Sequence, residues 1–258
     1  MDMSEITIVE HTKKDLSNSL LVVAFPTVGL VSSIAGYYII KTLGLKEIGV
    51  ILSDDFSPTT VIYNGRPSAP VRIYAGKKEC GPNKECDQIA VVISEFLPPF
   101  ETIKPLSDAI LGWAKEKNCR YIIGLEGTHV ENEDNDDDTE VLGVISNDSL
   151  KPMLKKHKIK QSTDGMITGV SGVMLYSAAL SNQDVICLLS SAHENFPDSR
   201  AAAFLVEKLD RMLPGIKIDS KPLFKESEEI EKQIRKHIKQ SKPTAPPVIP
   251  PIPTGMYG

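Results

Sequence analysis

The sequence has few of the features on which secreted and nucleic-acid-binding proteins depend. Only four of its 258 residues are cysteines and there is no signal-peptide pattern, which argues against a disulfide-stabilised secreted domain and predicts a cytoplasmic protein. Lysine and arginine form no concentrated patch, so nucleic-acid binding has no support. The formal net charge of −5 comes from one place, because the segment 131–140 carries seven acidic residues and no basic one. The rest of the chain is close to neutral.

The sequence also has no convincing membrane-spanning segment. An uncharged run, Leu20–Ile40, is long enough to cross a bilayer as a helix. It contains Pro26 and Gly29, however, and these two residues favour a turn inside the run. We therefore expect a buried strand over Leu20–Phe25, a buried helix over 28–43 and no contact with a membrane.

Patterns that bind phosphate or metal ions are absent. Neither glycine-rich phosphate-loop pattern occurs, and we interpret Phe25–Leu30 as a tight turn between a strand and a helix rather than as an anion site. Cys80 and Cys86 are separated by five residues with no histidine nearby, which is wider than the spacing of zinc knuckles. The acidic segment 131–140 lacks the glycine of a calcium-binding loop. We expect no metal and no cofactor.

Candidates for catalysis are few. The segment Ser190–Glu194, which contains His193, follows a predicted strand, and active sites of α/β sheets commonly lie at strand ends. Adjacent serine and histidine side chains diverge along the backbone, and the G-x-S-x-G pattern of hydrolases is absent. Glu126 and His129, at the end of another predicted strand, match no known arrangement of catalytic residues. We expect a polar rim and no enzymatic activity.

Short apolar segments alternate with helical patterns along the chain. The clearest helix covers Thr102–Lys117, in which Ile103, Leu106 and Ile110 recur with helical spacing. This alternation predicts an α/β fold, a three-layer sandwich in which helices cover both faces of a mostly parallel mixed sheet. The turn sequence Asn64–Pro67 predicts a hairpin that adds antiparallel strands to it. The predicted strands cover residues 6–9, 20–25, 47–52, 60–63, 71–74, 88–94, 121–125 and 185–189.

Two further helices are predicted near the C-terminus, over 198–212 and over 223–240. In the second helix Ile230, Ile234 and Ile238 form a narrow apolar stripe among charged residues, so only one edge is expected to pack. The stripe contacts either the body of the same chain or a neighbouring subunit. We divide the chain into an α/β domain (1–218), a C-terminal helix (219–240) and a flexible proline-rich tail (241–258).

The tail carries the most specific functional signal. It holds six of the chain's 18 prolines, which excludes a helix and favours an extended polyproline conformation that reaches on the order of 50 Å over 242–258 at about 3.1 Å per residue. The chain finishes with Met256, Tyr257 and Gly258. A partner can bind each of these residues in its own way. An apolar groove can take the Met256 side chain, a hydrogen bond can hold the Tyr257 hydroxyl group, and a cation or backbone amides can bind the terminal carboxylate of Gly258. We predict a partner-binding site here.

Several segments together make the chain resemble the archaeal form of the proteasome assembly chaperone family, the homologues of proteasome assembly chaperone 2. The resemblance covers residues 8–239. The segments that carry it are Val22–Gly29, Arg66–Pro67, Gly165–Gly172, and Phe196–Pro197–Asp198 followed by Ala201–Ala202. The acidic segment 131–140 is not a motif of that family.

The resemblance implies a domain similar to that of nucleoside phosphorylases, without their catalysis, and a tendency to form homo-oligomers. It also implies that a hydrophobic-Tyr-any C-terminus enters pockets between α subunits of the proteasome core particle, where a lysine receives the carboxylate. The implied function is an ATP-independent assembly chaperone or activator-like protein that docks on the α ring through Met256, Tyr257 and Gly258.

Two alternatives stay open from the sequence. One is a hydrolase-like or phosphorylase-like enzyme that acts on a small anionic substrate near Gly29, Glu126 and His193. The other is a proline-rich ligand for an unrelated adaptor protein, which would use the tail but not its last three residues.

Overall fold

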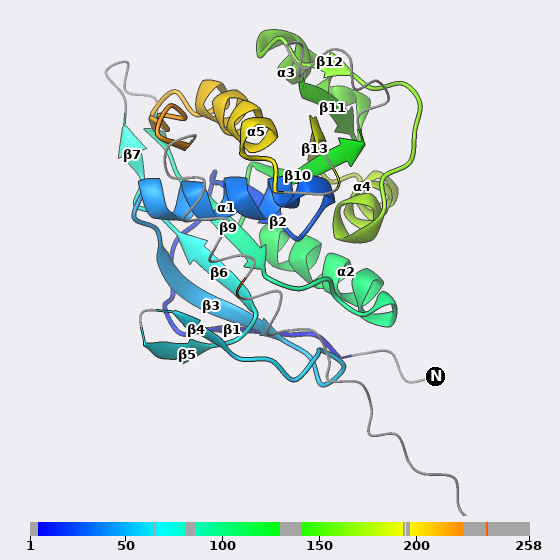
Figure 1. Cartoon of the computed structure of the whole chain (residues 1–258). Helices are drawn as coiled ribbons and strands as arrows, with labels where there is room; N and C mark the ends of the chain where they lie inside the picture. Colours follow the sequence, from blue (N-terminus) through cyan, green and yellow to red (C-terminus); the bar gives the residue numbers. More distant parts are fainter. Residues whose placement is uncertain are drawn as a thin grey trace, which may run out of the picture.

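The computed structural model describes residues 5–63, 65–80, 86–129, 141–192, 194, 197–223 and 236. Within these residues the central feature is a nine-stranded mixed sheet with helices on both faces (Figure 1). The three-layer α/β class predicted from the sequence is therefore confirmed.

Four parallel strands form the middle of the sheet. In spatial order they are β9 (Ile89–Ser94), β2 (Leu20–Ala24), β10 (Tyr121–His129) and β13 (Val185–Ala192). β2 and β9 are buried along their whole length. Such strands have no polar face, which is why they appear in the sequence as continuous apolar runs rather than as alternating patterns.

Antiparallel strands extend the sheet on both sides. Beside β9 lie β6 (Val71–Ala75), β3 (Lys46–Leu52) and β1 (Thr7–Glu10), each antiparallel to its neighbour. Beside β13 lies the antiparallel β11 (Val141–Ile145), followed by the short β12 (Lys160–Gln161), which is parallel to β11. The parallel character of the sheet is thus concentrated at its centre.

All four central strands end at the same side of the sheet. Because they are parallel, with Val22 opposite both Val91 and Ile123, β2, β9 and β10 all run towards this side, and β10 extends beyond the end of β2. The end of β13 lies beside the end of β10. We call this side the carboxyl edge. It is the usual position of ligand sites in open α/β sheets.

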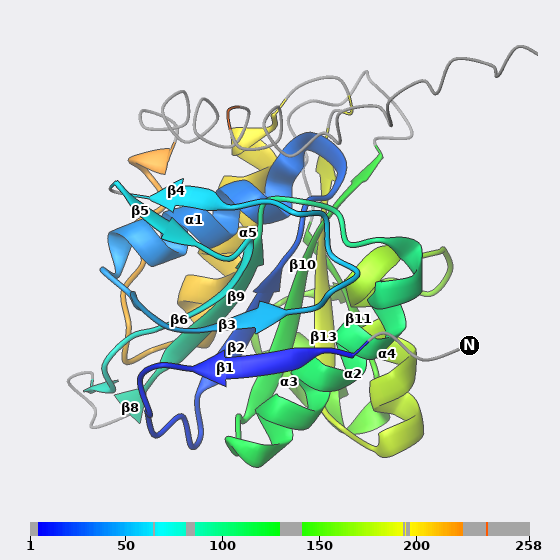
Figure 2. The ribbon, with the colours of Figure 1, turned by 90° about the horizontal axis from the view of Figure 1, so that it is seen from below.

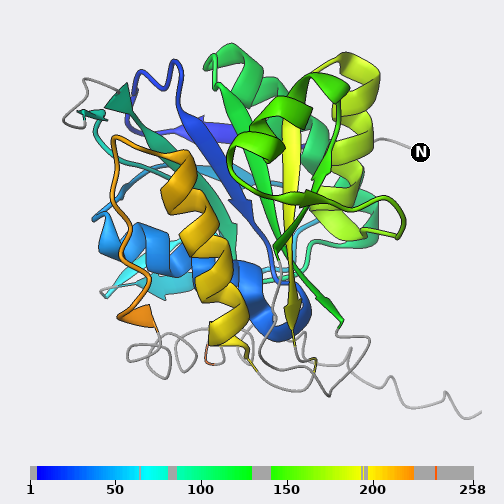
Figure 3. The same cartoon turned by 90° about the horizontal axis from the view of Figure 1, so that it is seen from above.

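Helices from distant parts of the sequence cover the two faces (Figures 2 and 3). The helices α1 (Val31–Thr42) and α5 (Ser199–Met212) share one hydrophobic cluster with one face of the sheet. The other cluster contains α2 (Phe100–Glu116) and α4 (Gly169–Ser181). The short helix α3 (Lys151–Lys156) lies between β11 and β12 along the chain.

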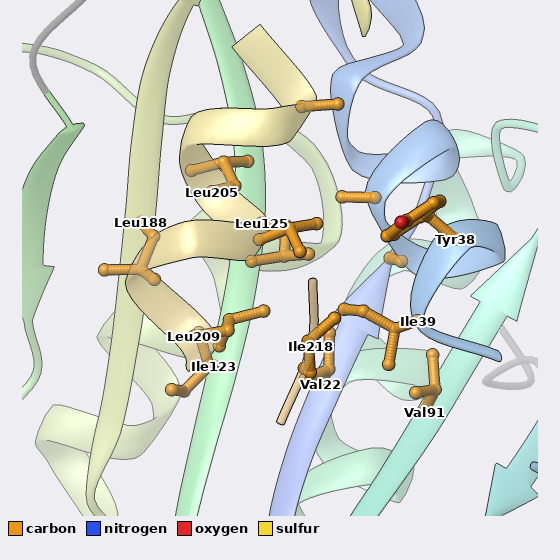
Figure 4. Close-up of a cluster of buried hydrophobic side chains, with 14 of the residues drawn as sticks. Val22, Tyr38, Ile39, Val91, Ile123, Leu125, Leu188, Leu205, Leu209 and Ile218 are labelled. Carbon is orange, nitrogen blue, oxygen red and sulfur yellow. The ribbon is translucent and has the colours of Figure 1, made fainter. Parts of the chain in front are cut away.

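The cluster under α1 and α5 also fixes the segment 213–223. Figure 4 shows Ile218 packed with Ile39, Val22 and Leu209. The hydroxyl group of Tyr38 donates a hydrogen bond to the carbonyl of Asp219. Figure 3 shows this segment running back alongside α5 towards the carboxyl edge.

The hairpin prediction is right about the turn and wrong about the sheet. The strands β4 (Val61–Tyr63) and β5 (Arg66–Ser68) pair with each other in a separate two-stranded sheet instead of joining the main one. A second small ribbon, β7 (Glu79–Cys80) with β8 (Cys86–Asp87), places the two cysteine positions opposite each other in its register.

The uncharged run near the N-terminus is divided between β2 and α1, as predicted, with the 3-10 turn Val28–Leu30 between them. None of the helices in the described ranges has the length and apolar character needed to span a bilayer. The predicted helix 223–240 lies outside the described residues, apart from Leu223 and Lys236.

Candidate functional site

The turn between β2 and α1 lies at the carboxyl edge and is held by hydrogen bonds from within the protein. The hydroxyl oxygen of Thr27 accepts hydrogen bonds from the amides of Gly127, at 3.1 Å, and of Ser32, at 3.4 Å. The amide of Leu30 donates to the carbonyl of Thr27. Gly29 and Leu30 both adopt positive φ angles, 60° and 52°. The structure therefore agrees with a tight structural turn, because the amides of Leu30, Val31 and Ser32 are bonded within the turn itself.

The same turn supports the start of α5. The amide of Asp198 donates a 2.8 Å hydrogen bond to the carbonyl of Gly29, and a carboxylate oxygen of Asp198 accepts one from the amide of Ala201. The second bond is a helix N-cap. This explains why the sequence Pro197–Asp198 followed by Ala201 belongs with Val22–Gly29, since the two segments touch at the carboxyl edge.

A partly buried carboxyl group lies on the α4 side of β10. Glu126 is hydrogen-bonded to Ser171 in the first turn of α4, and burial raises the pKa of Glu126 to about 8. The thiol of Cys187 on the neighbouring strand is fully buried, and burial together with the charge of Glu126 raises its pKa well above the ordinary value. A thiol whose pKa is raised in this way is a poor nucleophile. The pair is suited to packing rather than to covalent chemistry.

A second buried group of charges lies on the α1 side. The guanidinium of Arg72, on β6, contacts the carboxylate of Glu95, which directly follows β9, and both side chains are almost completely buried. The hydroxyl group of Tyr37 on α1 donates to Glu95, and it accepts from Arg72 at 3.2 Å. Burial raises the pKa of Glu95, while the adjacent guanidinium favours the ionised form. The group joins two strands and a helix.

The polar residues that the sequence suggested for catalysis do not form a complete set of catalytic groups among the described residues. His129 at the end of β10 pairs with Glu194, and both side chains are well exposed. Ser190 is buried, and its hydroxyl has no partner among the described residues. Gly29 and Glu126 lie at the carboxyl edge, whereas His193 lies outside the described residues. Between described residues we find no serine or cysteine hydrogen-bonded to a histidine, and no cluster able to bind a metal ion.

The predicted partner-binding residues Met256, Tyr257 and Gly258 lie outside the described residues, as do the acidic segment 131–140 and Phe196. Sequence reasoning missed the contact between Arg72 and Glu95. The available signal was one arginine inside the apolar run of β6 and one glutamate directly after the apolar run of β9. A charged residue in such a position is rarely buried without a partner.

These features define an α/β scaffold whose edge is held together by internal contacts. The family model described as the PAC2 family matches residues 21–238, and the chain belongs to this family. It is 31% identical over 232 residues, 90% of each chain, to an uncharacterized protein of Methanocaldococcus jannaschii.

Among solved structures, PbaA of Pyrococcus furiosus, described as an archaeal homolog of proteasome-assembly chaperone, is 30% identical with a TM-score of 0.77. That match covers 92% of this chain and 98% of PbaA. PbaB of the same organism, described as an archaeal proteasome activator, has a TM-score of 0.74 at 22% identity, with 91% of this chain and 99% of PbaB covered. The second likeness concerns the fold alone.

Proposed function

We propose that this protein is an ATP-independent proteasome assembly chaperone or activator-like protein that docks on the α ring of the proteasome core particle through Met256, Tyr257 and Gly258. The observation that carries the proposal is the 30% identity to PbaA over 92% of the chain. Membership of the PAC2 family supports it as well. In this proposal the protein catalyses no reaction and needs no cofactor.

The described body supplies an anchor for the tail. Leu213, Ile216, Ile218 and Leu223 are all buried in the cluster under α1 and α5. The amide of Gly215 donates a 2.6 Å hydrogen bond to the carboxylate of Asp87. In the proposal, this fixed segment attaches the C-terminal part of the chain to the body at Leu223.

Each of the last three residues has its own role in the proposal. The side chain of Met256 enters an apolar groove, and the ring of Tyr257 packs while its hydroxyl group makes one hydrogen bond. Gly258 contributes its terminal carboxylate to a lysine on an α subunit. The identity of the last side chain matters little.

A single tripeptide buries little area and binds weakly, so several tails must act together. We propose that the protein forms homo-oligomers whose tails bind neighbouring α-subunit pockets. Linked sites of this kind gain about 10² to 10⁴ in avidity without any new contact. The body then provides the geometry and the tails provide the affinity.

The direct test is deletion of Met256–Gly258, followed by measurement of binding to purified proteasome core particles. We expect binding to fall at least tenfold while the oligomeric state stays unchanged. Addition of one residue after Gly258 should have a similar effect, because it moves the carboxylate. Unchanged binding in both variants would rule out docking through the end of the tail.

A matched control separates this proposal from recognition of the prolines. Replacement of Pro250 and Pro251 by alanine leaves the last three residues intact and should change core-particle binding by less than about threefold. A polyproline-binding adaptor would respond in the opposite way, because it depends on the PPII conformation and not on the carboxylate.

A further inference from the structure

The helix α4 has no charged residue anywhere in its 13 positions. Its inner face packs on the sheet and α2 through Val170, Met174, Leu175 and Ala178. The outer face exposes 49% of Tyr176 and 86% of Leu180. In all three overall views α4 lies at the rim of the molecule (Figures 1 to 3). The surface helix is therefore uncharged all round and carries large apolar side chains on its exposed face, which is typical of a helix covered by another element.

The neighbouring helix α2 differs from α4, because it carries charged residues on its exposed face. On α2 the exposed side chains of Lys104 and Asp108 form an ion pair one turn apart, which is an ordinary solvent-facing arrangement. The two helices are in contact, since the hydroxyl of Ser107 donates to the carbonyl of Val170 at 3.3 Å. Among the described residues, nothing covers the outer face of α4 at Tyr176 and Leu180.

The outer residues of α4 follow a coiled-coil spacing. Gly169, Val173, Tyr176 and Leu180 are separated by four, three and four positions. This is the alternation of a and d positions in a heptad, which places side chains in one seam along a helix. The seam is short: Val173, Tyr176 and Leu180 form its helical part, and Gly169, whose φ of 70° is not helical, lies at its start.

The seam is complementary to an antiparallel copy of itself. A two-fold axis midway between Val173 and Tyr176 places Val173 opposite Tyr176 of the other copy and Gly169 opposite Leu180. Each large side chain then meets a smaller residue, so the two helices can approach without a clash. No charge is removed from water, because α4 carries none.

We propose that α4 packs antiparallel against α4 of a second copy of this chain and forms an isologous contact of the oligomer. The inference deepens the self-association part of the proposed function and rests on it. A helix pair alone covers less than the roughly 800 Å² per partner of a standard interface. The contact therefore needs further apolar side chains, and the exposed ones nearest along the chain or on the neighbouring helix are Met166, 93% exposed and three residues before α4, and Phe100, 86% exposed at the start of α2.

The first test measures molecular mass by light scattering for full-length wild type and for the variants Tyr176→Glu and Leu180→Glu. Both side chains are exposed, so the variants should fold, which circular dichroism and thermal unfolding will check. We expect the mass to fall to half or less at micromolar concentration, because two carboxylates per interface would lose their hydration. Ile62→Glu, on the separate ribbon and 58% exposed, is the matched control and should keep the wild-type mass.

The second test concerns the register of the two helices. The proteins Val173→Cys and Tyr176→Cys are mixed, allowed to exchange subunits and mildly oxidised. The mixture should form a covalent dimer on a non-reducing gel, whereas each variant alone should stay near the wild-type background of its native cysteines. Cross-linking of one variant alone that equals or exceeds that of the mixture would overturn the antiparallel register.

Failure of this inference is distinct from failure of the proposed docking. If Tyr176→Glu and Leu180→Glu keep the wild-type mass, or if wild type is monomeric throughout, the α4 contact is overturned. The tail deletion tests core-particle binding separately and should leave the mass unchanged. Loss of mass in the α4 variants without loss of fold supports the α4 contact whatever the tail binds.

Discussion

The guanidinium of Arg72 contacts the carboxylate of Glu95 in the interior of the protein, with 1% and 3% of the two residues exposed. The Nε and Nη1 atoms of Arg72 and one oxygen of Glu95 have no hydrogen-bond partner among the described residues. A buried pair of this kind adds little net stability, because desolvation offsets the attraction. Loss of one partner is costly, however, since the other charge then stays buried alone.

Glu95→Gln should therefore lower the free energy of unfolding by about 3 to 5 kcal/mol, because an arginine cannot lose its charge. Arg72→Met should cost less at low pH, since Glu95 can then bind a proton, and burial raises its pKa. As pH rises and Glu95 ionises without its partner, the penalty for Arg72→Met should grow. Urea unfolding at pH 6 and pH 8.5 measures both effects.

The exposed pair of Lys104 and Asp108 on α2 gives the control. Lys104→Ala should change the free energy of unfolding by no more than about 0.5 kcal/mol. Equal losses for Glu95→Gln and Lys104→Ala would contradict the role assigned to the buried pair.

Glu126 should make stability depend on pH. Its pKa in the folded protein, about 8, lies above the ordinary value of 4.5, so the fold favours the neutral form. The contribution of Glu126 is thus complete below pH 4.5 and is lost as pH rises towards 8. Glu126→Gln keeps a neutral polar group and should stabilise the protein by about 1 to 3 kcal/mol at pH 9, with little difference at pH 4.

Subtraction of the two unfolding curves across this range isolates Glu126 from other carboxylates. Glu194→Gln, at a side chain that is 62% exposed, is the comparison variant and should show a smaller change between pH 4 and pH 9 than Glu126→Gln. A flat difference curve for Glu126→Gln would show that Glu126 is ionised in the fold at neutral pH.

Gly127 should not tolerate a side chain. A methyl group there would lie 2.1 Å from the carbonyl oxygen of Val28, so the turn between β2 and α1 would have to move. We expect Gly127→Ala to lower the free energy of unfolding by about 2 to 4 kcal/mol. Gly112 lies on α2 with no atom within 4 Å of the added group, so Gly112→Ala should stabilise by about 0.5 to 1 kcal/mol. Thermal and urea unfolding of both variants test the opposite signs.

The proposed role of the tail predicts that core-particle binding depends on the terminal carboxylate of Gly258 and not on the side chain at that position. Gly258→Ala preserves the terminal carboxylate and should leave core-particle binding within about twofold of wild type, whereas Tyr257→Ala should weaken it at least tenfold through loss of packing and a hydrogen bond. Surface plasmon resonance on immobilised core particles measures both. A large loss for Gly258→Ala would contradict the role assigned to the carboxylate.

Much of the fold could be predicted because its signals are local. The strands β2, β9 and β13 and the helix α2 follow from apolar runs and from helical spacing within one segment. The strand β11 and the helix α4 were missed. In α4 an apolar residue occupies both faces, so the usual contrast between a buried and a polar face is absent.

The sequence by itself determined the α/β class, the order of the central strands along the chain and the identity of the three residues at the end of the tail. Only the tertiary structure decided that Arg72 meets Glu95, that Gly127 lies against Val28, and that Tyr176 and Leu180 face outward. The reason is physical. A helix or strand propensity acts between near neighbours, whereas a buried ion pair, a backbone contact and an exposed face depend on how distant segments pack.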